Sequence, residues 1–263
     1  MDNVSADPLT AFRLDGRLIV VTGASEGIGR TFAESFARAG ARLVLASRRR
    51  EKLEAVQQTI RGFGGQAEVV PTDVTKLSDI CALGDAVRDL VHEGDEHLVL
   101  VNNAGLGFTK AALDVTEEDW DGLFDTHAKG TFFCSQQIGR TMIERGYGKI
   151  INLSSAWAVI TDIGKSPYCA AKAAIGHLTA ALSTEWAPLG VRVNALAPTT
   201  TMSDFTAKNM AANPPRAQRL LSKIKLGRFA QPSDHVGAAI FLASAASDFV
   251  TGRTLFVDGG STS

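Results

Sequence analysis

Short runs of aliphatic and β-branched residues recur along the chain, each followed by a longer segment with helical character. This alternation leaves few architectures open, because strands joined by helices run parallel and must be covered on both faces. The sequence therefore predicts an α/β fold in which a doubly wound parallel sheet of about seven strands carries helices on both faces. The expected strands are residues 17–22, 41–47, 66–71, 97–102, 149–154, 191–196 and 254–259.

Length and composition fit one large domain. The chain has 263 residues, 45% of them hydrophobic, and α/β chains of this size commonly bury a single core. Residues 1–263 are therefore expected to form one domain. The formal net charge is −1, from 27 basic and 28 acidic residues, so no overall field would attract nucleic acid or an anionic membrane. The expected partner is a small-molecule substrate.

Cysteine usage and the N-terminal segment indicate a reducing compartment. The three cysteines are odd in number and lack metal-ligand spacing, so neither a disulfide framework nor a metal site is expected. The N-terminal segment has no basic region followed by an apolar stretch, and no segment is long and apolar enough to span a bilayer. The expected location is the cytoplasm.

Residues 199–223 break the alternation of strands and helices. This stretch contains two consecutive prolines and mixes methionine and phenylalanine with charged residues. Such an insertion after the carboxyl end of a strand is typical of a lid over a binding site, although a surface excursion has the same pattern. The sequence predicts a substrate lid within the single domain.

Glycines follow the first expected strand directly. The sequence TGASEGIG places Gly23, Gly27 and Gly29 between this strand and a helix that begins near Ile28. Glycines here allow a tight turn, and the amides at a helix N-terminus favour an anionic group such as a pyrophosphate. The spacing differs from the more familiar G-x-G-x-x-G, but its position between strand and helix predicts a dinucleotide site.

The end of the second expected strand indicates which dinucleotide is bound. Ser47 stands where many NAD-binding proteins carry an acid for the adenosine ribose, and Arg48 follows it. A guanidinium can bind a 2′-phosphate with paired hydrogen bonds, so NADP(H) is the preferred cofactor and NAD(H) the second choice. Arg49 and Arg50 are expected to belong to a solvated helix start. Asp73, after the third strand, either accepts from the adenine amino group or caps a helix.

A tyrosine and a lysine lie four residues apart in YCAAK. On a helix, Tyr168 and Lys172 would share one face, and a neighbouring cation lowers the pKa of a phenol from its usual value of about 10. The pair predicts a tuned acid/base, although two unrelated polar residues on a surface helix give the same spacing.

The motifs occur in one order along the chain: TGASEGIG, ASR, DV, NNAG, INLSSAW, YCAAK, VRVNALAP and TGRTLFVDGG. In this order they resemble the short-chain dehydrogenase/reductase family, and the resemblance covers residues 14–260. It implies a Rossmann-type fold and an NAD(P)-dependent oxidoreductase, which moves a hydride between the nicotinamide and a carbonyl or secondary alcohol. This chemistry requires no metal.

The resemblance also implies a role for each catalytic residue. Tyr168 is the proton donor in reduction and the base in oxidation, Lys172 lowers the pKa of Tyr168 and holds the nicotinamide ribose, and Ser155 hydrogen-bonds the substrate carbonyl. Ser154 is the competing serine, but its register fits the motif less well. The expected cofactor contacts are Gly23, Ser25, Gly27, Ile28, Gly29, Ser47, Arg48, Asp73, Val74, Asn103, Ala104, Gly105, Tyr168, Lys172, Pro198, Thr199, Thr201 and Ser203.

Three positions depart from the family pattern. His127 stands where the family usually carries the asparagine that completes a catalytic tetrad with a relay water. It either preserves this geometry while adding a titratable group or only packs. Pro198 is followed by Thr199 instead of glycine, and the threonines here either contact a polar substrate or satisfy the turn. Leu98 replaces an acid near the start of the fourth strand, which is interpreted as a packing change.

The segments expected around the substrate mix aromatic, aliphatic and hydroxyl groups, which suits a small polar ketone or secondary alcohol. The motifs are similar to those of the sugar-acid and polyol dehydrogenases of the family and of its 3-oxoacyl thioester reductases, so both substrate classes stay open. The sequence has no unpaired cationic cluster that would indicate a carboxylate on the substrate, although Lys165, Lys208 and Arg216 are candidates to reach one. The expected substrate contacts are Phe108, Trp157, Ile163, Met202 and Phe205.

A protein of another class would share this fold. A non-catalytic NADP-binding regulatory or scaffold protein is the alternative, and only His127 favours it. The family generally assembles through the long helices before and after the serine strand, so a homodimer or homotetramer is expected. These helices are expected at residues 116–145 and 168–186.

Overall fold

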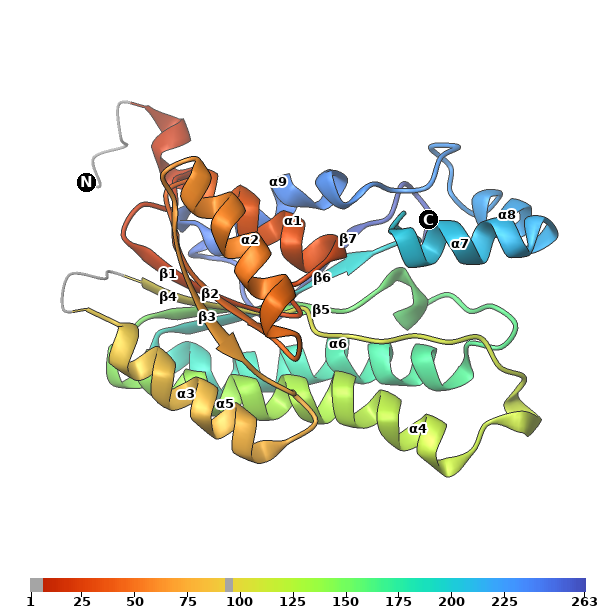
Figure 1. Cartoon of the computed structure of the whole chain (residues 1–263), viewed down its shortest axis with the longest axis horizontal. Helices are drawn as coiled ribbons and strands as arrows, with labels where there is room; N and C mark the ends of the chain where they lie inside the picture. Colours follow the sequence, from red (N-terminus) through yellow and green to blue (C-terminus); the bar gives the residue numbers. More distant parts are fainter. Residues whose placement is uncertain (1–6, 93–96) are drawn as a thin grey trace.

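The seven expected strands are present and form one parallel sheet (Figure 1). The computed structural model describes residues 7–92 and 97–263, except for the side chains of Asp204 and Phe205. Within these residues the strand order is β3-β2-β1-β4-β5-β6-β7, which confirms the doubly wound α/β fold. The strands are β1 Arg17–Thr22, β2 Arg42–Ser47, β3 Gln66–Pro71, β4 His97–Asn102, β5 Gly148–Leu153, β6 Val191–Pro198 and β7 Thr254–Val257.

Helices cover both faces of the sheet (Figure 1). α1, α2 and α9 lie on one face, and α3, α5 and α6 lie on the other. In the described part of the chain, none of the helices is long and apolar enough to span a bilayer. The helices are α1 Gly27–Arg38, α2 Arg50–Gly62, α3 Leu77–Leu90, α4 Glu117–Phe124, α5 Gly130–Glu144, α6 Ser166–Trp186, α7 Asp204–Ala212, α8 Pro214–Leu221 and α9 Val236–Ala243.

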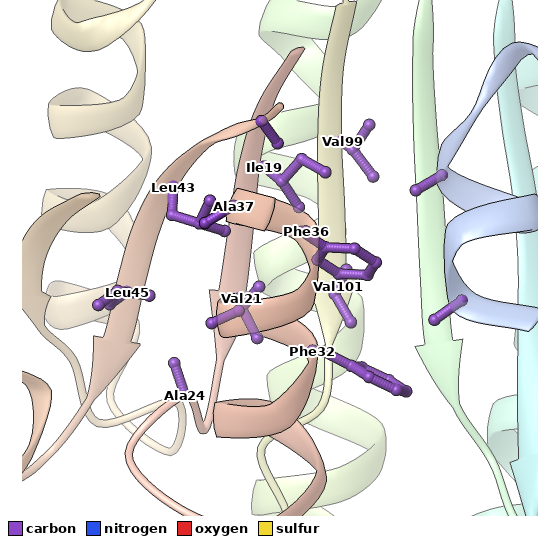
Figure 2. Close-up of a cluster of buried hydrophobic side chains, with 14 of the residues drawn as sticks. Ile19, Val21, Ala24, Phe32, Phe36, Ala37, Leu43, Leu45, Val99 and Val101 are labelled. Carbon is purple, nitrogen blue, oxygen red and sulfur yellow. The ribbon is translucent and has the colours of Figure 1, made fainter. Parts of the chain in front are cut away.

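The apolar core has a cluster of buried side chains on each face of the sheet. Successive residues of β1 point in opposite directions, so Ile19 and Val21 join the cluster under α1 while their neighbours join the other. Figure 2 shows Phe32 and Phe36 of α1 beside these strand residues. Burial on both faces explains why the strand sequences are almost continuously apolar instead of alternating.

The strand order reverses between β1 and β4. The chain runs from β1 outward to β2 and β3, and then returns to the other side of β1 for β4 and the strands after it. Open α/β sheets bind ligands beyond the carboxyl ends of the strands at such a point. The glycine turn follows β1 and NNAG follows β4, so both lie at this edge.

The expected helix at residues 116–145 is divided by a change of winding. α4 is followed by a π-helical stretch, Asp125–Lys129, and α5 begins at the next residue. π-helical turns occur mostly as single turns inside α-helices and are frequent at functional sites. His127 lies within this stretch.

Residues 199–223 contain two helices, α7 and α8. Figure 1 shows them beyond the carboxyl end of β6, at the same edge of the sheet as the glycine turn. Residues 199–223 therefore lie at the edge of the sheet where the glycine turn and NNAG also lie.

Candidate active site

The residue that follows β4 forms hydrogen bonds with the glycine turn that follows β1. Gly23 and Gly27 have φ angles of +65° and +57°, a region that favours glycine. Gly29 has no room for a side chain, because a Cβ would lie 2.3 Å from both Asn103 Nδ2 and the Gly23 carbonyl oxygen. Asn103 Nδ2 donates to the carbonyl oxygens of Thr22 and Gly23, at 3.0 and 3.2 Å. α1 therefore begins against a braced turn, and its free N-terminal amides lie where a phosphate would bind.

Polar groups at the end of β2 fit the adenosine side of NADP. The Ser47 hydroxyl oxygen is buried and has no hydrogen-bond partner among the described residues. Arg48 is exposed and forms no ion pair within the same part of the chain. Arg49 and Arg50 instead pair with glutamates, at 2.7 and 3.6 Å. Arg49 and Arg50 therefore have structural partners, and Ser47 with Arg48 could meet a 2′-phosphate.

Other expected cofactor contacts lie along the same edge. Asp73 Oδ1 accepts from the amide and the hydroxyl of Thr75, at 3.1 and 2.8 Å, so this oxygen closes a turn. Ser25 and Val74 are 9% and 8% exposed. The loop after β4 is held by the Thr22 hydroxyl, which accepts from the amide of Ala104 at 3.1 Å.

Tyr168 and Lys172 both lie on α6, with Lys172 Nζ 5.7 Å from the centre of the tyrosine ring. Lys172 is 5% exposed, and its ammonium donates to the Leu153 carbonyl oxygen at 2.6 Å. Burial lowers the pKa of Lys172 to about 7. Burial raises the pKa of Tyr168 to about 12, although hydrogen bonding with Ser155 acts in the opposite direction. This direction differs from the decrease expected from the spacing, because loss of water around the phenol dominates.

The two serines after β5 have different partners. Ser154 Oγ donates to the Lys172 carbonyl oxygen at 3.0 Å, so it holds α6 against the sheet. Ser155 Oγ lies 3.3 Å from the Pro198 carbonyl oxygen and also interacts with the Tyr168 hydroxyl. Of the two serines, Ser155 is therefore the one that shares a site with Tyr168.

His127 lies against Tyr168 and is 2% exposed. The two rings meet edge to face, with their centres 5.6 Å apart. His127 Nε2 lies 2.7 Å from the carbonyl oxygen and 3.3 Å from the amide nitrogen of Leu106, and the shorter contact favours the tautomer with a proton on Nε2. Its Nδ1 is then an acceptor, and this buried atom has no hydrogen-bond partner among the described residues. Burial, and after it the charge of Lys172, lowers the pKa of His127 to about 3, so the ring is neutral at physiological pH.

The hydroxyl groups after β6 are bound within the protein. Thr201 Oγ1 lies 2.9 Å from the Thr199 carbonyl oxygen and 2.8 Å from His235 Nε2. The Thr199 hydroxyl lies 3.0 Å from Ser261 Oγ, and Ser203 caps α7. These contacts satisfy the turn, which was one of the two expected roles of the threonines. His235 is fully buried and was missed, because no motif marks a histidine 34 residues beyond its threonine partner.

The five expected substrate contacts differ in their exposure. Trp157 is 9% exposed, Phe108 and Met202 are half-buried, and Ile163 is 74% exposed. The side chain of Phe205 lies outside the described residues. Trp157, Phe108 and Met202 thus have the burial expected of a pocket wall, whereas Ile163 faces solvent.

This arrangement can transfer a proton to or from an oxygen atom. A phenol that stays protonated, a hydroxyl and an ammonium come together at the carboxyl end of β5. Among the residues described, no three His, Cys, Asp or Glu side chains are grouped so that they could hold a metal ion.

Comparisons with known proteins bear on this chemistry. A family model described as enoyl-(acyl carrier protein) reductase matches residues 23–262. The gluconate 5-dehydrogenase of Gluconobacter oxydans is 38% identical over 251 residues, which are 95% of this chain and 96% of that protein. The galactitol 2-dehydrogenase (L-tagatose-forming) of Cereibacter sphaeroides is 38% identical over 260 residues, which are 97% of this chain and 99% of that protein.

A solved structure of a dehydrogenase is also similar to this chain. The crystal structure of a gluconate 5-dehydrogenase from Burkholderia cenocepacia, in complex with NADP and tartrate, is similar to this chain with a TM-score of 0.91. The two sequences are 36% identical, and the similarity covers 97% of this chain and 99% of the other. The likeness therefore extends over nearly the whole of both chains.

Proposed function

Because this chain belongs to the short-chain dehydrogenase/reductase family and is an oxidoreductase of CH-OH groups, we propose that it transfers a hydride between NADP(H) and a small, sugar-derived ketone or secondary alcohol. The observation that carries the proposal is the convergence of Tyr168, Ser155 and Lys172. The sugar and polyol dehydrogenase relatives support the substrate class, and the NADP-bound neighbour supports the cofactor.

The three side chains have separate tasks in this mechanism. When bound, the nicotinamide supplies or accepts the hydride. In reduction, negative charge grows on the substrate oxygen, and Tyr168 gives that oxygen a proton while Ser155 donates a hydrogen bond to it. The pKa of about 12 keeps Tyr168 protonated until this step. In oxidation Tyr168 must act as a base, and the positive charge of Lys172, 5.7 Å from the ring, favours its phenolate.

Ser47 and Arg48 are proposed to select NADP(H) over NAD(H). Two features of the described residues support this choice: the buried Ser47 hydroxyl has no hydrogen-bond partner there, and the exposed Arg48 forms no ion pair there. NAD(H), whose ribose hydroxyl could meet Ser47, is the second cofactor.

His127 is proposed as a positioning residue in place of the family's asparagine. Its buried Nδ1 is an acceptor, and Lys172 is near enough for its charge to lower the pKa of His127. A water bound at Nδ1 would connect His127 to the polar groups around Lys172. A neutral histidine therefore keeps a hydrogen-bonding group at this position, which weakens the case for a non-catalytic protein.

The proposal also includes a substrate lid, a homo-oligomer and a cellular compartment. Residues 199–223, with α7 and α8, would close over the substrate. A homodimer or homotetramer would form through α5 and α6, the long helices through which the family generally assembles. The cytoplasm is the proposed compartment.

Initial rates test the proposal directly. They would be measured with NADPH and NADH, in both directions, for keto-sugars, keto-acids, polyols and 3-oxoacyl thioesters. Tyr168→Phe removes the proton donor and is expected to lower kcat by about 100-fold or more while NADPH still binds. Tyr147→Phe is the matched control, because the Tyr147 hydroxyl bonds to Asp248 at 2.7 Å and belongs to no part of the site. Activity that survives Tyr168→Phe, or turnover confined to 3-oxoacyl thioesters, would contradict the proposal.

A further inference from the structure

A lysine that the mechanism does not use lies beside Tyr168. Lys165 directly precedes α6, and its Nζ lies 5.6 Å from the centre of the Tyr168 ring. The Lys165 ammonium donates to the Phe108 carbonyl oxygen at 2.6 Å. An ammonium has three N–H donors, so this contact leaves donors for a further acceptor.

Arg216 approaches Lys165 from the lid. Its Nε is buried and has no hydrogen-bond partner among the described residues, and over the same residues Arg216 forms no ion pair. Arg219, three residues after Arg216 on α8, is bonded to Asp162, three residues before Lys165, so α8 lies against the loop that carries Lys165. In agreement with this placement, burial, followed by the charge of Arg216, lowers the pKa of Lys165 to about 8. Two neighbouring cations repel, and a buried donor without an acceptor costs free energy, unless an anion binds to both.

The acid that acts on Lys165 has other partners. Asp162 is 3% exposed at its side chain and accepts from the Arg219 guanidinium at 3.1 and 3.3 Å. Lys223 Nζ lies 3.9 Å from the same carboxylate. Asp162 also acts on the pKa of Lys165, but less strongly than Arg216 does. This corner of the site therefore has a surplus of positive charge.

We propose that Lys165 and Arg216 bind a carboxylate of the substrate, which makes the protein selective for a sugar acid over a neutral polyol. The inference rests on the proposed function and narrows its substrate class. A guanidinium and an ammonium both bind a carboxylate more strongly than a hydroxyl group, and the planar guanidinium can do so with two hydrogen bonds. Because Lys165 precedes α6 and Arg216 belongs to α8, a carboxylate bound to both would also hold the lid closed beside Tyr168.

Overall sequence identity does not distinguish a sugar acid from a neutral polyol as the substrate. The gluconate and galactitol dehydrogenases described above are both 38% identical to this chain, although the first is named for an acid and the second for a polyol. Lys165, which lies next to Tyr168, and Arg216 favour the acid. Both residues are among the three cations that the sequence offers as candidates to reach a carboxylate.

Matched substrate pairs isolate the carboxylate. In the presence of NADP+, kcat and KM would be measured for D-gluconate against D-glucitol and for D-galactonate against galactitol. The members of each pair differ in one terminal group. The variants are Lys165→Gln and Arg216→Gln, with Arg216→Lys to restore the charge and Lys208→Gln as the control. Lys208 is the third cation that the sequence offers for a carboxylate, but it is exposed on α7 and is not part of the proposed pair, so its substitution removes a lid charge without touching that pair.

We expect at least one acid to exceed its polyol in kcat/KM by about tenfold or more, which corresponds to about 1.4 kcal/mol. Lys165→Gln and Arg216→Gln would each remove about tenfold of the activity on the acid, mainly through KM, and change the polyol by less than about twofold. Arg216→Lys would recover part of the loss, and Lys208→Gln would change neither substrate.

Two results would overturn the carboxylate inference: a polyol used as well as its acid, or equal losses on both substrates in the variants. Turnover that still depends on Tyr168 would leave the proposed function standing in either case. If neither pair is turned over, calorimetric titration of the protein with D-gluconate or D-galactonate, in the presence of NADP+, tests the carboxylate inference by binding instead. Binding weakened about tenfold by Lys165→Gln would support the inference, and no binding to the unmodified protein would overturn it.

Discussion

Replacing His127 with asparagine is expected to make the fold less sensitive to acid. Burial, and after it the charge of Lys172, lowers the pKa of His127 to about 3, whereas a histidine in an unfolded chain titrates near 6.5. Below pH 6.5 the unfolded state binds a proton that the folded state excludes, so stability falls as the pH falls. Each pH unit in this window costs about 1.4 kcal/mol, so about 2 kcal/mol is lost between pH 7 and pH 5.

Urea unfolding at pH 7 and pH 5, at equal protein concentration, measures this loss. The unmodified protein is expected to lose about 2 kcal/mol more than His127→Asn. Burial also lowers the pKa of His235, to about 4, but His235 is present in both proteins and its contribution cancels. His177→Asn replaces an exposed histidine of α6 and controls for the substitution itself. Equal losses in the unmodified protein and in His127→Asn would refute a neutral, buried His127.

Two further substitutions test the cofactor edge of the sheet. Arg48→Asp is expected to weaken NADPH binding about tenfold or more and to keep NADH binding, and fluorescence titration with both cofactors measures this. Equal dissociation constants for NADPH and NADH in the unmodified protein would count against a 2′-phosphate site. Gly29→Ala is expected to destabilise the fold by about 1–3 kcal/mol, because its Cβ would lie 2.3 Å from the Gly23 carbonyl oxygen. Thermal unfolding should show no such loss for Gly122→Ala in α4, where nothing lies within 4 Å of the added Cβ.

The sheet could be predicted from the sequence because its signals are local. Each strand is a contiguous apolar run, and each parallel connection requires a helix between strands. The π-helical stretch Asp125–Lys129 could not be predicted in the same way. α4, this stretch and α5 read as one helical pattern, and the change of winding has no marker in residue type.

The chemistry of the site depends on contacts between distant segments, and the sequence predicted less of it. The spacing of Tyr168 and Lys172 shows that a cation is near the phenol, but not that Lys172 is buried and Tyr168 half-buried. Loss of water around the phenol raises its pKa, which is opposite to the expected decrease. Lys165 meets a carbonyl oxygen 57 residues away, at Phe108. α8, which carries Arg216, meets the loop before α6 only because Arg219 pairs with Asp162, 57 residues away in sequence.

His127 can replace the family's asparagine only if its ring stays neutral beside the Lys172 ammonium. Burial opposes charge on Tyr168, Lys172 and His127 alike, and of the three only Lys172, with a pKa of about 7, changes charge near neutral pH. A histidine that became charged in the same range would repel the Lys172 ammonium and weaken a positive charge that favours the Tyr168 phenolate. The low pKa of His127, to which Lys172 itself contributes, prevents this competition. A histidine can therefore stand at this position because burial, helped by the charge of Lys172, keeps it neutral.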